Sequence, residues 1–338
     1  MMNTKAIILQ CRADSKFHSG KIRVDTTNML EDTSEILHSD TLFSALVNLA
    51  AKVMPNQVED LIAAFRAHEI KVSSIFYCLE NKGKYIYFLP KPLNFNVVQS
   101  GADRKSVKKI DFISKGIWEQ KTEATHWFDE TKCTVLQNKF VCLNEELLDL
   151  GIKQEQGKYI EIFHTSATPK VHVHKEISDK ENRYYTQANI HIADNESIVQ
   201  VHLYFLVNEN LNAALKNRLN TLFALLPHEG VGGDRTSGSG IFEDTCEQPF
   251  SIRNQDGKAV SLSLTVPADD AEFAAFESYE FCIRGGRQTH QDGTLKRVRM
   301  IAEGAVLNSA DVHGTIVDIS SSSNAPYLRN GKCLTLIY

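Results

Sequence analysis

A glycine-rich segment, residues 228–242, carries the residue types best suited to hold a phosphate group. Arg235, at its centre, offers a planar guanidinium for a phosphate, and Ser237 and Ser239 add hydroxyl groups. Glycine tolerates positive φ, so such a loop can turn backbone N–H groups toward phosphate oxygens. We therefore predict a phosphate-binding loop, with a flexible turn between a helix and a strand as the alternative. Five of the chain's 18 glycines lie here: Gly230, Gly232, Gly233, Gly238 and Gly240.

This segment matches neither of the common nucleotide-binding signatures. A Walker A loop ends in Gly-Lys-Ser/Thr, a tripeptide that the sequence lacks. The dinucleotide pattern G-x-G-x-x-G follows a strand, whereas this segment follows a helical pattern and misplaces the third glycine. A site for a nucleoside triphosphate or for NAD is therefore disfavoured.

An abrupt change of charge marks residues 268–299. Residues 268–280 carry five acids and no Lys or Arg, whereas residues 281–299 carry five Lys or Arg and a single acid. Arg284 and Arg287 flank a Gly-Gly pair, and arginines around a glycine turn can follow a sugar–phosphate backbone. On charge alone we predict that both arginines contact RNA; the alternative is a solvated hairpin.

The histidines suggest two further chemistries. His172 and His174 alternate, so on a strand both would face one side and could ligate zinc. No nearby Cys or carboxylate pattern completes a tetrahedral site, and we expect no metal and no other cofactor. His18 lies in a basic segment, where it could act as a general base for RNA cleavage at the 2′-hydroxyl. The alternatives for His18 are a phosphate or base contact and a purely structural role.

Length and composition limit the class of protein. A chain of 338 residues corresponds to about two domains. Its 37 basic and 42 acidic residues give a net charge of −5, which excludes binding of nucleic acid by bulk positive charge but permits a local basic groove. Seven scattered cysteines, an odd number without a C-x-x-C pair, fit a reducing compartment. With no signal peptide and no long apolar stretch, we expect a cytoplasmic protein that does not contact a membrane.

Hydrophobic patterns predict a strand over residues 5–12, then a helix capped by Ser39 or Asp40, and later a hairpin around residues 81–83. Residues 93–195 are harder to read and include one predicted helix over residues 108–119. A core strand follows from Ile198. After it we predict an amphipathic helix that is capped by Asn208 or Asn210 and stopped by Pro227.

Both halves thus begin with a strand, continue with a helix and end in antiparallel-looking strands. This pattern predicts an α+β fold with a boundary near residue 195. The N-terminal domain would comprise residues 1–195 with irregular insertions. The C-terminal domain would comprise residues 196–338 and contain the glycine-rich loop.

Four segments in this order resemble one family. They are His18-Ser19-Gly20 after the first strand, Ser39 to Leu46 at a helix start, Leu-Pro-Lys-Pro at 89–92, and Gly232 to Gly240. Together they are similar to the RAMP superfamily, specifically to the fourth Csm subunit of type III-A CRISPR effector complexes. The similarity spans most of the chain, although residues 93–165 carry no recognised motif.

The resemblance implies two ferredoxin-like, RRM-related domains with antiparallel sheets. It implies a subunit that holds the 5′ handle of the guide RNA, docks the large polymerase-like signalling subunit and meets a RAMP backbone subunit. Target cleavage would belong to the backbone subunit, so we expect no enzymatic activity of this chain. By motif position the implied RNA contacts are His18, Ser19, Gly20, Ser39, Gly232, Gly233, Arg235, Ser237, Gly238 and Gly240.

Two other functions remain open at this stage. A related RAMP endoribonuclease that processes precursor guide RNA would use His18 as its base. An enzyme of another family could bind a small phosphorylated substrate on the glycine-rich loop, in which case a nucleotide would protect the protein and RNA would not matter.

Overall fold

The computed structural model describes residues 3–20, 33–96, 103–172, 183–195, 198–253, 256–286, 295–320 and 326–338. The predicted RNA contact Arg287 and the candidate ligand His174 lie outside these ranges. Within the described residues, no helix has both the length and the apolar content needed to cross a membrane.

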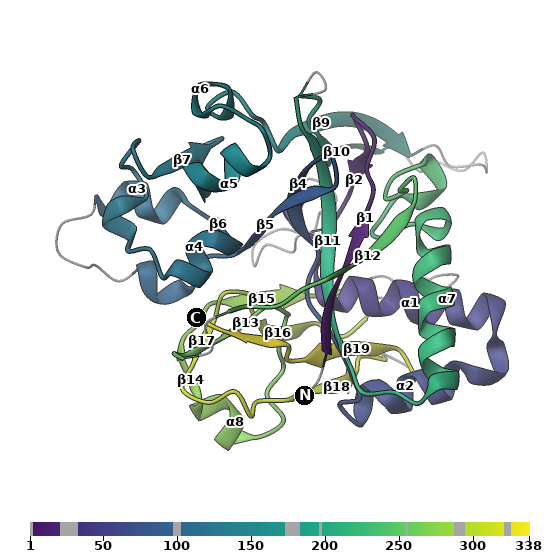
Figure 1. The fold of residues 1–338 in the computed structure, drawn as a ribbon. Coiled ribbons are helices and arrows are strands. Elements are labelled where there is room, and N and C mark those ends of the chain that lie inside the picture. Colours follow the sequence, from purple (N-terminus) through teal and green to yellow (C-terminus); the bar gives the residue numbers. More distant parts are fainter. Residues whose placement is uncertain are drawn as a thin grey trace.

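The first unit is built on four antiparallel strands. They lie in the order β12 (Thr245–Pro249), β1 (Asn3–Leu9), β11 (Gln200–Glu209) and β4 (Phe76–Asn81). Helix α1 (Ser39–Val53) follows β1 in the chain, and α7 (Ala213–Glu229) joins β11 to β12. This is the order of a ferredoxin-like β-α-β-β-α-β unit, with the first strand between the last and the third. The two helices pack beside each other, as Figure 1 shows.

The sheet of the first unit therefore crosses the boundary that we predicted near residue 195. β11 lies between β1 and β4, and β12 closes the far edge beside β1. The glycine-rich loop joins α7 to β12, so it belongs to the first unit instead of the second. The sequence pattern could not show this, because more than a hundred residues separate the second strand of the unit from its third.

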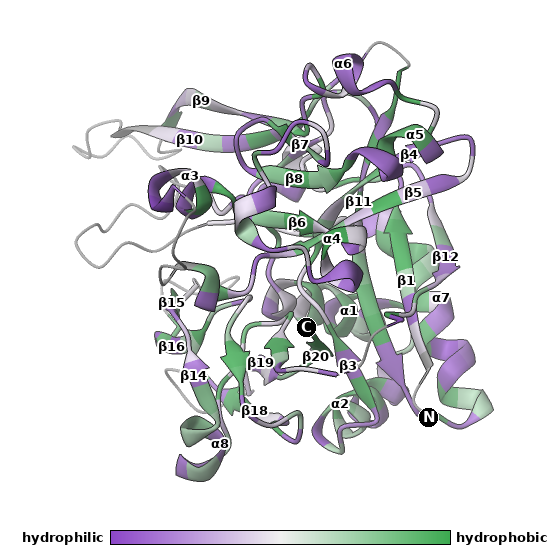
Figure 2. Ribbon diagram, turned by 60° about the vertical axis from the view of Figure 1, so that its left-hand side comes forward, coloured by the Kyte–Doolittle hydropathy of each residue, from purple (hydrophilic) through white to green (hydrophobic). Residues whose placement is uncertain are grey.

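The residues between β4 and β11 form an insertion with two parts. The first part extends the main sheet from β4 through β5, β6, β8 and β7 (Figure 1). The second part is a hairpin of β9 and β10, which pairs with β2 in a three-stranded sheet; we call residues 163–172 and 183–192 the arm. Figure 2 shows the arm projecting away from the body of the molecule. The bounds of these strands are β2 Lys16–Phe17, β5 Lys84–Pro90, β6 Phe112–Ser114, β7 Cys133–Leu136, β8 Phe140–Leu143, β9 Phe163–His172 and β10 Arg183–Ile192.

Shorter elements complete the first unit and its insertion. They are α2 Val58–Arg66, β3 Ile70–Val72, α3 Arg104–Lys109, α4 Lys115–Gln120, α5 Asn144–Asp149 and α6 Gln154–Gly157. The single helix predicted over residues 108–119 is thus wrong, because β6 separates two shorter helices there.

The second unit repeats the same strand order. Its sheet runs β14, β17, β13, β20, and every neighbouring pair is antiparallel. The short helix α8 lies between β13 and β14, and the hairpin of β18 and β19 stands where a second helix would be. The predicted α+β class with two ferredoxin-like units is confirmed. The bounds are β13 Ala259–Ser261, α8 Asp270–Ala274, β14 Phe276–Ser278, β15 Phe281–Arg284, β16 Val298–Ile301, β17 Val306–Leu307, β18 Gly314–Asp318, β19 Leu328–Lys332 and β20 Thr335–Ile337.

One hydrophobic core runs through the first unit and continues into the second, where Val260, Leu262 and Leu334 join it. The strands of the main sheet supply much of this core, and Figure 2 shows them as mostly hydrophobic. The two units therefore share buried apolar surface, which favours a fixed relative position.

The ends of both long helices differ from the prediction. His38 is the N-cap of α1, so Ser39 and Asp40 lie in its first turn. Asn212 caps α7, with its side chain accepting a hydrogen bond from the N–H of Leu215. Pro227 lies inside α7 instead of stopping it. Proline there removes a donor for the carbonyl of Phe223, and the hydroxyl of Thr245 supplies a long replacement hydrogen bond of 3.4 Å.

Candidate nucleic-acid interface

The glycine-rich loop lies directly against the His18 segment and the arm. The N–H of Gly233 donates to the carbonyl of His18 at 2.8 Å, and the N–H of Gly240 donates to the carbonyl of Lys16 at 2.8 Å. On the other side of the segment, Nδ1 of His18 lies 2.7 Å from the carbonyl oxygen of Ala188 in β10. Three stretches that are far apart in the sequence therefore meet at one place.

Two of the glycines are required by these close approaches between backbone segments. Gly240 has φ +77°, and a Cβ there would lie 2.1 Å from the carbonyl oxygen of Val231. Gly232 has φ +100°, and a Cβ there would lie 2.7 Å from the carbonyl oxygen of His18. Both conformations are unfavourable for other residues, and both contacts leave no room for a side chain. These glycines serve the packing of the loop on the protein.

The backbone N–H groups of the loop are mostly engaged inside the protein. Those of Ser237 and Gly238 donate to carbonyls of the loop itself, and four others do the same or reach the His18 segment: Val231, Gly233, Ser239 and Gly240. The prediction that the loop presents several N–H groups to a phosphate is therefore wrong for these residues. What the loop offers to a ligand is its exposed tip, residues 236–238, and its side chains.

Asp234 organises the loop, although sequence reasoning did not place it in the site. It adopts a left-handed conformation with φ +57°, and its carboxylate accepts hydrogen bonds from Lys170 at 2.9 Å and Gln187 at 2.8 Å in the arm. The hydroxyl of Ser237 donates to the same carboxylate at 2.8 Å. Burial raises the pKa of Asp234, but these three hydrogen bonds outweigh that effect and lower it to about 2. Asp234 thus remains charged at neutral pH and ties the loop to the arm.

Arg235 lies at the edge of this cluster and is partly open to solvent. Its guanidinium forms an ion pair with Glu229 at 2.6 Å, and its side chain is 36% exposed. Lys52 of α1 pairs with the same carboxylate at 2.7 Å and is 61% exposed. Hydrogen bonding from Lys52, more than the charge of Arg235, lowers the pKa of Glu229. Because Lys170 is also 30% exposed, three cations face solvent around two carboxylates, Glu229 and Asp234.

Ser39 and Arg284, two predicted RNA contacts, lie inside the junction between the two units. Ser39 is fully buried, and its hydroxyl accepts a hydrogen bond from the N–H of Leu264 at 3.0 Å. Arg284 is 9% exposed and holds the carboxylate of Asp40 through two hydrogen bonds of 2.9 and 3.1 Å. A third hydrogen bond of 3.2 Å runs from Arg284 to the carbonyl of Gly20. These residues position Gly20 and the start of α1, and their side chains are not on the surface.

Asp40 is the centre of this buried cluster. Arg329 of the second unit also pairs with its carboxylate, so one buried acid faces two buried arginines. Burial alone would raise the pKa of Asp40, but the charges of Arg284 and Arg329 hold it well below its usual range. The helix motif that begins at Ser39 contained this residue, yet nothing in the sequence indicated its partners, which lie more than 240 residues away.

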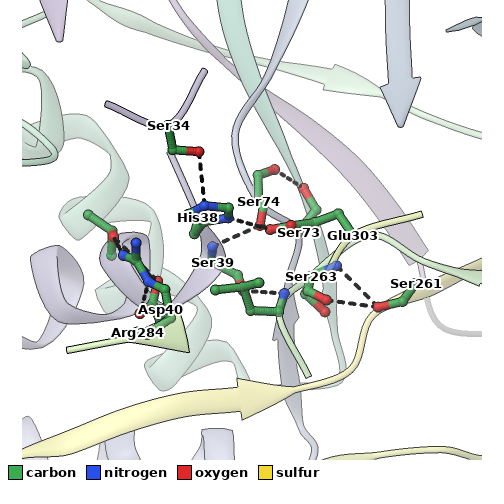
Figure 3. A network of polar contacts seen from close by, with 12 residues as sticks. Ser34, His38, Ser39, Asp40, Ser73, Ser74, Ser261, Ser263, Arg284 and Glu303 are labelled. Carbon is green, nitrogen blue, oxygen red and sulfur yellow. Dashed lines mark hydrogen bonds and ion pairs between the residues drawn. The ribbon is translucent and has the colours of Figure 1, made fainter. Parts of the chain in front are cut away.

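A second buried polar network lies beside the first (Figure 3). Nδ1 of His38 donates to Glu303 at 2.8 Å, and Nε2 lies 3.0 Å from the hydroxyl of Ser34. Ser74 also donates to Glu303 and accepts a hydrogen bond from the N–H of Ser39 at 2.8 Å. Burial raises the pKa of Glu303, but His38 and Ser74 lower it overall. Sequence reasoning missed this network, because its members come from three separate segments with no motif spacing.

The remaining predicted site residues belong to the same region. Ser19 is buried, and its N–H donates to the hydroxyl of Thr33 at 3.1 Å. Gly20 is half-buried, and Gly238 and Ser237 lie at the exposed tip of the loop. His172 is the last residue of β9, and its partner in the predicted metal pair, His174, falls outside the described ranges.

The chain thus consists of two ferredoxin-like units, with a glycine-rich loop after the second helix of the first. The family model for the CRISPR Csm4 C-terminal domain matches residues 254–337, which coincide with the second unit. The chain is 28% identical to the CRISPR protein Csm4 of Methanocaldococcus jannaschii, over 95% of this chain and 90% of the relative. It is 24% identical to Csm4 of Streptococcus thermophilus, over 85% and 86%. The chain is therefore similar to Csm4 proteins over most of its length, and its second unit matches the Csm4 C-terminal domain.

Solved structures have the same fold. A chain in the crystal structure of a Csm3–Csm4 subcomplex of the type III-A CRISPR-Cas interference complex matches with a TM-score of 0.70 and 22% identity, and the match covers 99% of both chains. A chain in the crystal structure of a Csm1–Csm4 cassette with AMPPNP matches with a TM-score of 0.57 and 16% identity, covering 98% and 97%.

Proposed function

We propose that this chain is a non-catalytic RNA-binding subunit of a type III-A CRISPR interference complex. It holds the 5′ handle of the guide RNA, docks the large polymerase-like signalling subunit and meets a RAMP backbone subunit. The 28% identity to a Csm4 protein over 95% of the chain, and the likeness to chains from Csm1–Csm4 and Csm3–Csm4 assemblies, support a place in such a complex. The observation that carries the RNA-binding role is the meeting of the loop, the His18 segment and the arm, with three cations, Lys52, Lys170 and Arg235, partly or largely open to solvent around Asp234 and Glu229.

The contacts available at this surface suit a short single strand. Arg235 and Lys170 are both partly exposed and can each reach a phosphate oxygen, while their ion pairs with Glu229 and Asp234 fix their positions. Among the described residues, no atom lies within 4 Å of a Cβ built on Gly238, so a sugar or base can approach the backbone at the tip. Affinity therefore comes from a few positioned side chains, which is compatible with a net charge of −5.

The environment of His18 supports a scaffold role over RNA cleavage. The ring is buried, and its Nδ1 must carry the proton because the carbonyl oxygen of Ala188 can only accept. Gly233 covers another edge of the ring, since a Cβ there would lie 2.9 Å from Cδ2. A general base has to come within hydrogen-bond reach of the 2′-hydroxyl that it activates, and a buried ring is poorly placed for this.

Arg235→Ala tests the loop as the RNA site. We expect it to weaken binding of labelled repeat RNA by about 1–3 kcal/mol, the range for a hydrogen bond to a charged group. The matched control is Arg218→Ala, because Arg218 is also partly exposed and pairs with a carboxylate, that of Asp60, at 3.1 Å. Binding is measured by titration at two salt concentrations. Equal binding by the folded Arg235→Ala and Arg218→Ala variants would remove the loop from the site.

The labelled repeat RNA from these binding titrations is also separated on a gel, which tests the alternative that the protein is an endoribonuclease. We expect the repeat RNA to remain intact with the wild type. Metal-independent cutting at one position that is lost in His18→Ala would overturn the non-catalytic assignment.

A further inference from the structure

Asp14, His164 and His191 form a cluster outside the surface described above. One ring nitrogen from each histidine and a carboxylate oxygen of Asp14 all lie within 4.8 Å of one another. His164 and His191 are exposed and half-buried, respectively, so an ion can reach them from solvent. Neither the sequence motifs nor the RNA-binding role uses these three side chains.

The backbone of the arm brings the two histidines together. His191 of β10 lies directly opposite His164 of β9, so both side chains leave the same face of the hairpin. Their rings are stacked with centroids 5.0 Å apart and an interplanar angle of 7°. Ser166, two residues beyond His164 on that face, lies with its hydroxyl 2.8 Å from Nε2 of His191. A hydrogen bond to one ring nitrogen fixes the orientation of the ring. The ring also makes a hydrogen bond to the backbone of Asp14, which a bound ion would replace.

The third side chain is supplied by the turn before β2. Asp14 adopts φ +61°, and its N–H donates to the carbonyl of Ile192 at 3.0 Å. The N–H of Ile192 in turn donates to the carbonyl of Ser15 at 2.9 Å. These two hydrogen bonds hold the turn against Ile192, the residue that follows His191. They thereby keep the carboxylate of Asp14 beside the rings of His164 and His191.

We propose that Asp14, His164 and His191 bind a divalent transition-metal ion of the zinc class at the base of the arm. Two imidazole nitrogens and one carboxylate oxygen are a common ligand set for Zn²⁺, and three protein ligands leave the fourth tetrahedral position to water. Magnesium and calcium prefer sites made of oxygen ligands and are not expected to compete. Bound metal would fasten the arm to the turn at residue 14. This proposal rests on the fold and does not depend on the RNA-binding role.

One cationic neighbour opposes the ion. Lys16 lies opposite His191 on β2, and its positive charge would repel a metal cation bound there. We therefore expect Lys16→Ala to tighten metal binding, which a cluster that binds no metal would not show.

The test is a titration of the full chain, stripped with a chelator, with Zn²⁺ followed by calorimetry and with Co²⁺ followed by visible absorption. We expect one ion per chain, the intense absorption of four-coordinate Co²⁺, and a higher unfolding temperature with Zn²⁺ but not with Mg²⁺. His164→Ala and His191→Ala should abolish all three signals, and Ser166→Ala should weaken binding about 10-fold.

The matched control is His228→Ala, which removes an exposed histidine on α7 and should keep wild-type binding. If a histidine variant fails to fold, Asp14→Asn tests the same site. Asp14 is exposed, and the asparagine variant keeps the backbone contacts at this position. Equal Zn²⁺ affinity of the wild type and of Asp14→Asn, or no binding by the wild type, would overturn the proposal.

Discussion

Replacing Asp40 by alanine is expected to lower the free energy of unfolding by about 3–5 kcal/mol, because the variant leaves two buried arginines without their counter-ion. Arg284 and Arg329 reach Asp40 from the second unit, and all three side chains are nearly inaccessible to solvent. The matched control is Asp60→Ala, which removes an exposed partner of Arg218 and should cost less than about 1 kcal/mol. Urea unfolding at neutral pH measures the free energy of unfolding of both variants and of the wild type.

The pH dependence of the free energy of unfolding is a second test of the prediction for Asp40→Ala. The pKa of Asp40 is lower in the folded chain than its usual value of about 3.9. Its contribution to stability is therefore complete above that usual value and is lost as the pH falls toward the lower folded value. The difference between the wild type and Asp40→Ala should shrink in acid. A difference below about 1 kcal/mol at neutral pH would contradict the buried cluster.

Gly240→Ala is expected to disrupt the glycine-rich loop, whereas Gly238→Ala leaves it in place. Both glycines have φ near +77°, so alanine costs about 1–2 kcal/mol at either position. Only at Gly240 would the new Cβ meet a backbone oxygen, that of Val231 at 2.1 Å, which adds about 1–3 kcal/mol for overpacking.

The two glycine variants should also differ in RNA binding. Gly240→Ala displaces the loop from the carbonyl of Lys16 and should lose most binding of the handle RNA, while Gly238→Ala adds only one methyl group at the open tip and should lose much less. Unfolding free energies and RNA titrations are measured on the same two proteins. If both variants bind RNA like the wild type, the packed loop is not needed for the site.

Local patterns predicted the local elements of this fold well. The first strand, α1, the hairpin of β4 and β5, β11 and α7 all follow from hydrophobic spacing and turn residues. The boundary near residue 195 was wrong because the first unit is completed by strands that lie beyond a long insertion. Strand pairing over such a distance leaves no signal in hydrophobic periodicity.

The structure brings the predicted loop and the His18 segment together, but several of their residues have other contacts than predicted. The glycines were predicted to bind phosphate, whereas in the structure Gly232 and Gly240 permit close contacts between backbone segments of the protein. Arg284 was assigned to the surface from a run of charges, and the structure buries it against Asp40. Charge patterns predict a solvated face, and only the three-dimensional fold reveals a partner so distant in the sequence.

The central claim, that this chain holds the 5′ handle of a guide RNA, is tested most directly by the RNA that copurifies with it. The full chain is isolated from cells that carry its complex, and the 5′ ends of the bound RNA are sequenced. We expect RNA with one uniform 5′ sequence, together with a larger protein partner, and a reduced RNA yield for Arg235→Ala. RNA with scattered 5′ ends, in equal yield from wild type and variant, would contradict it.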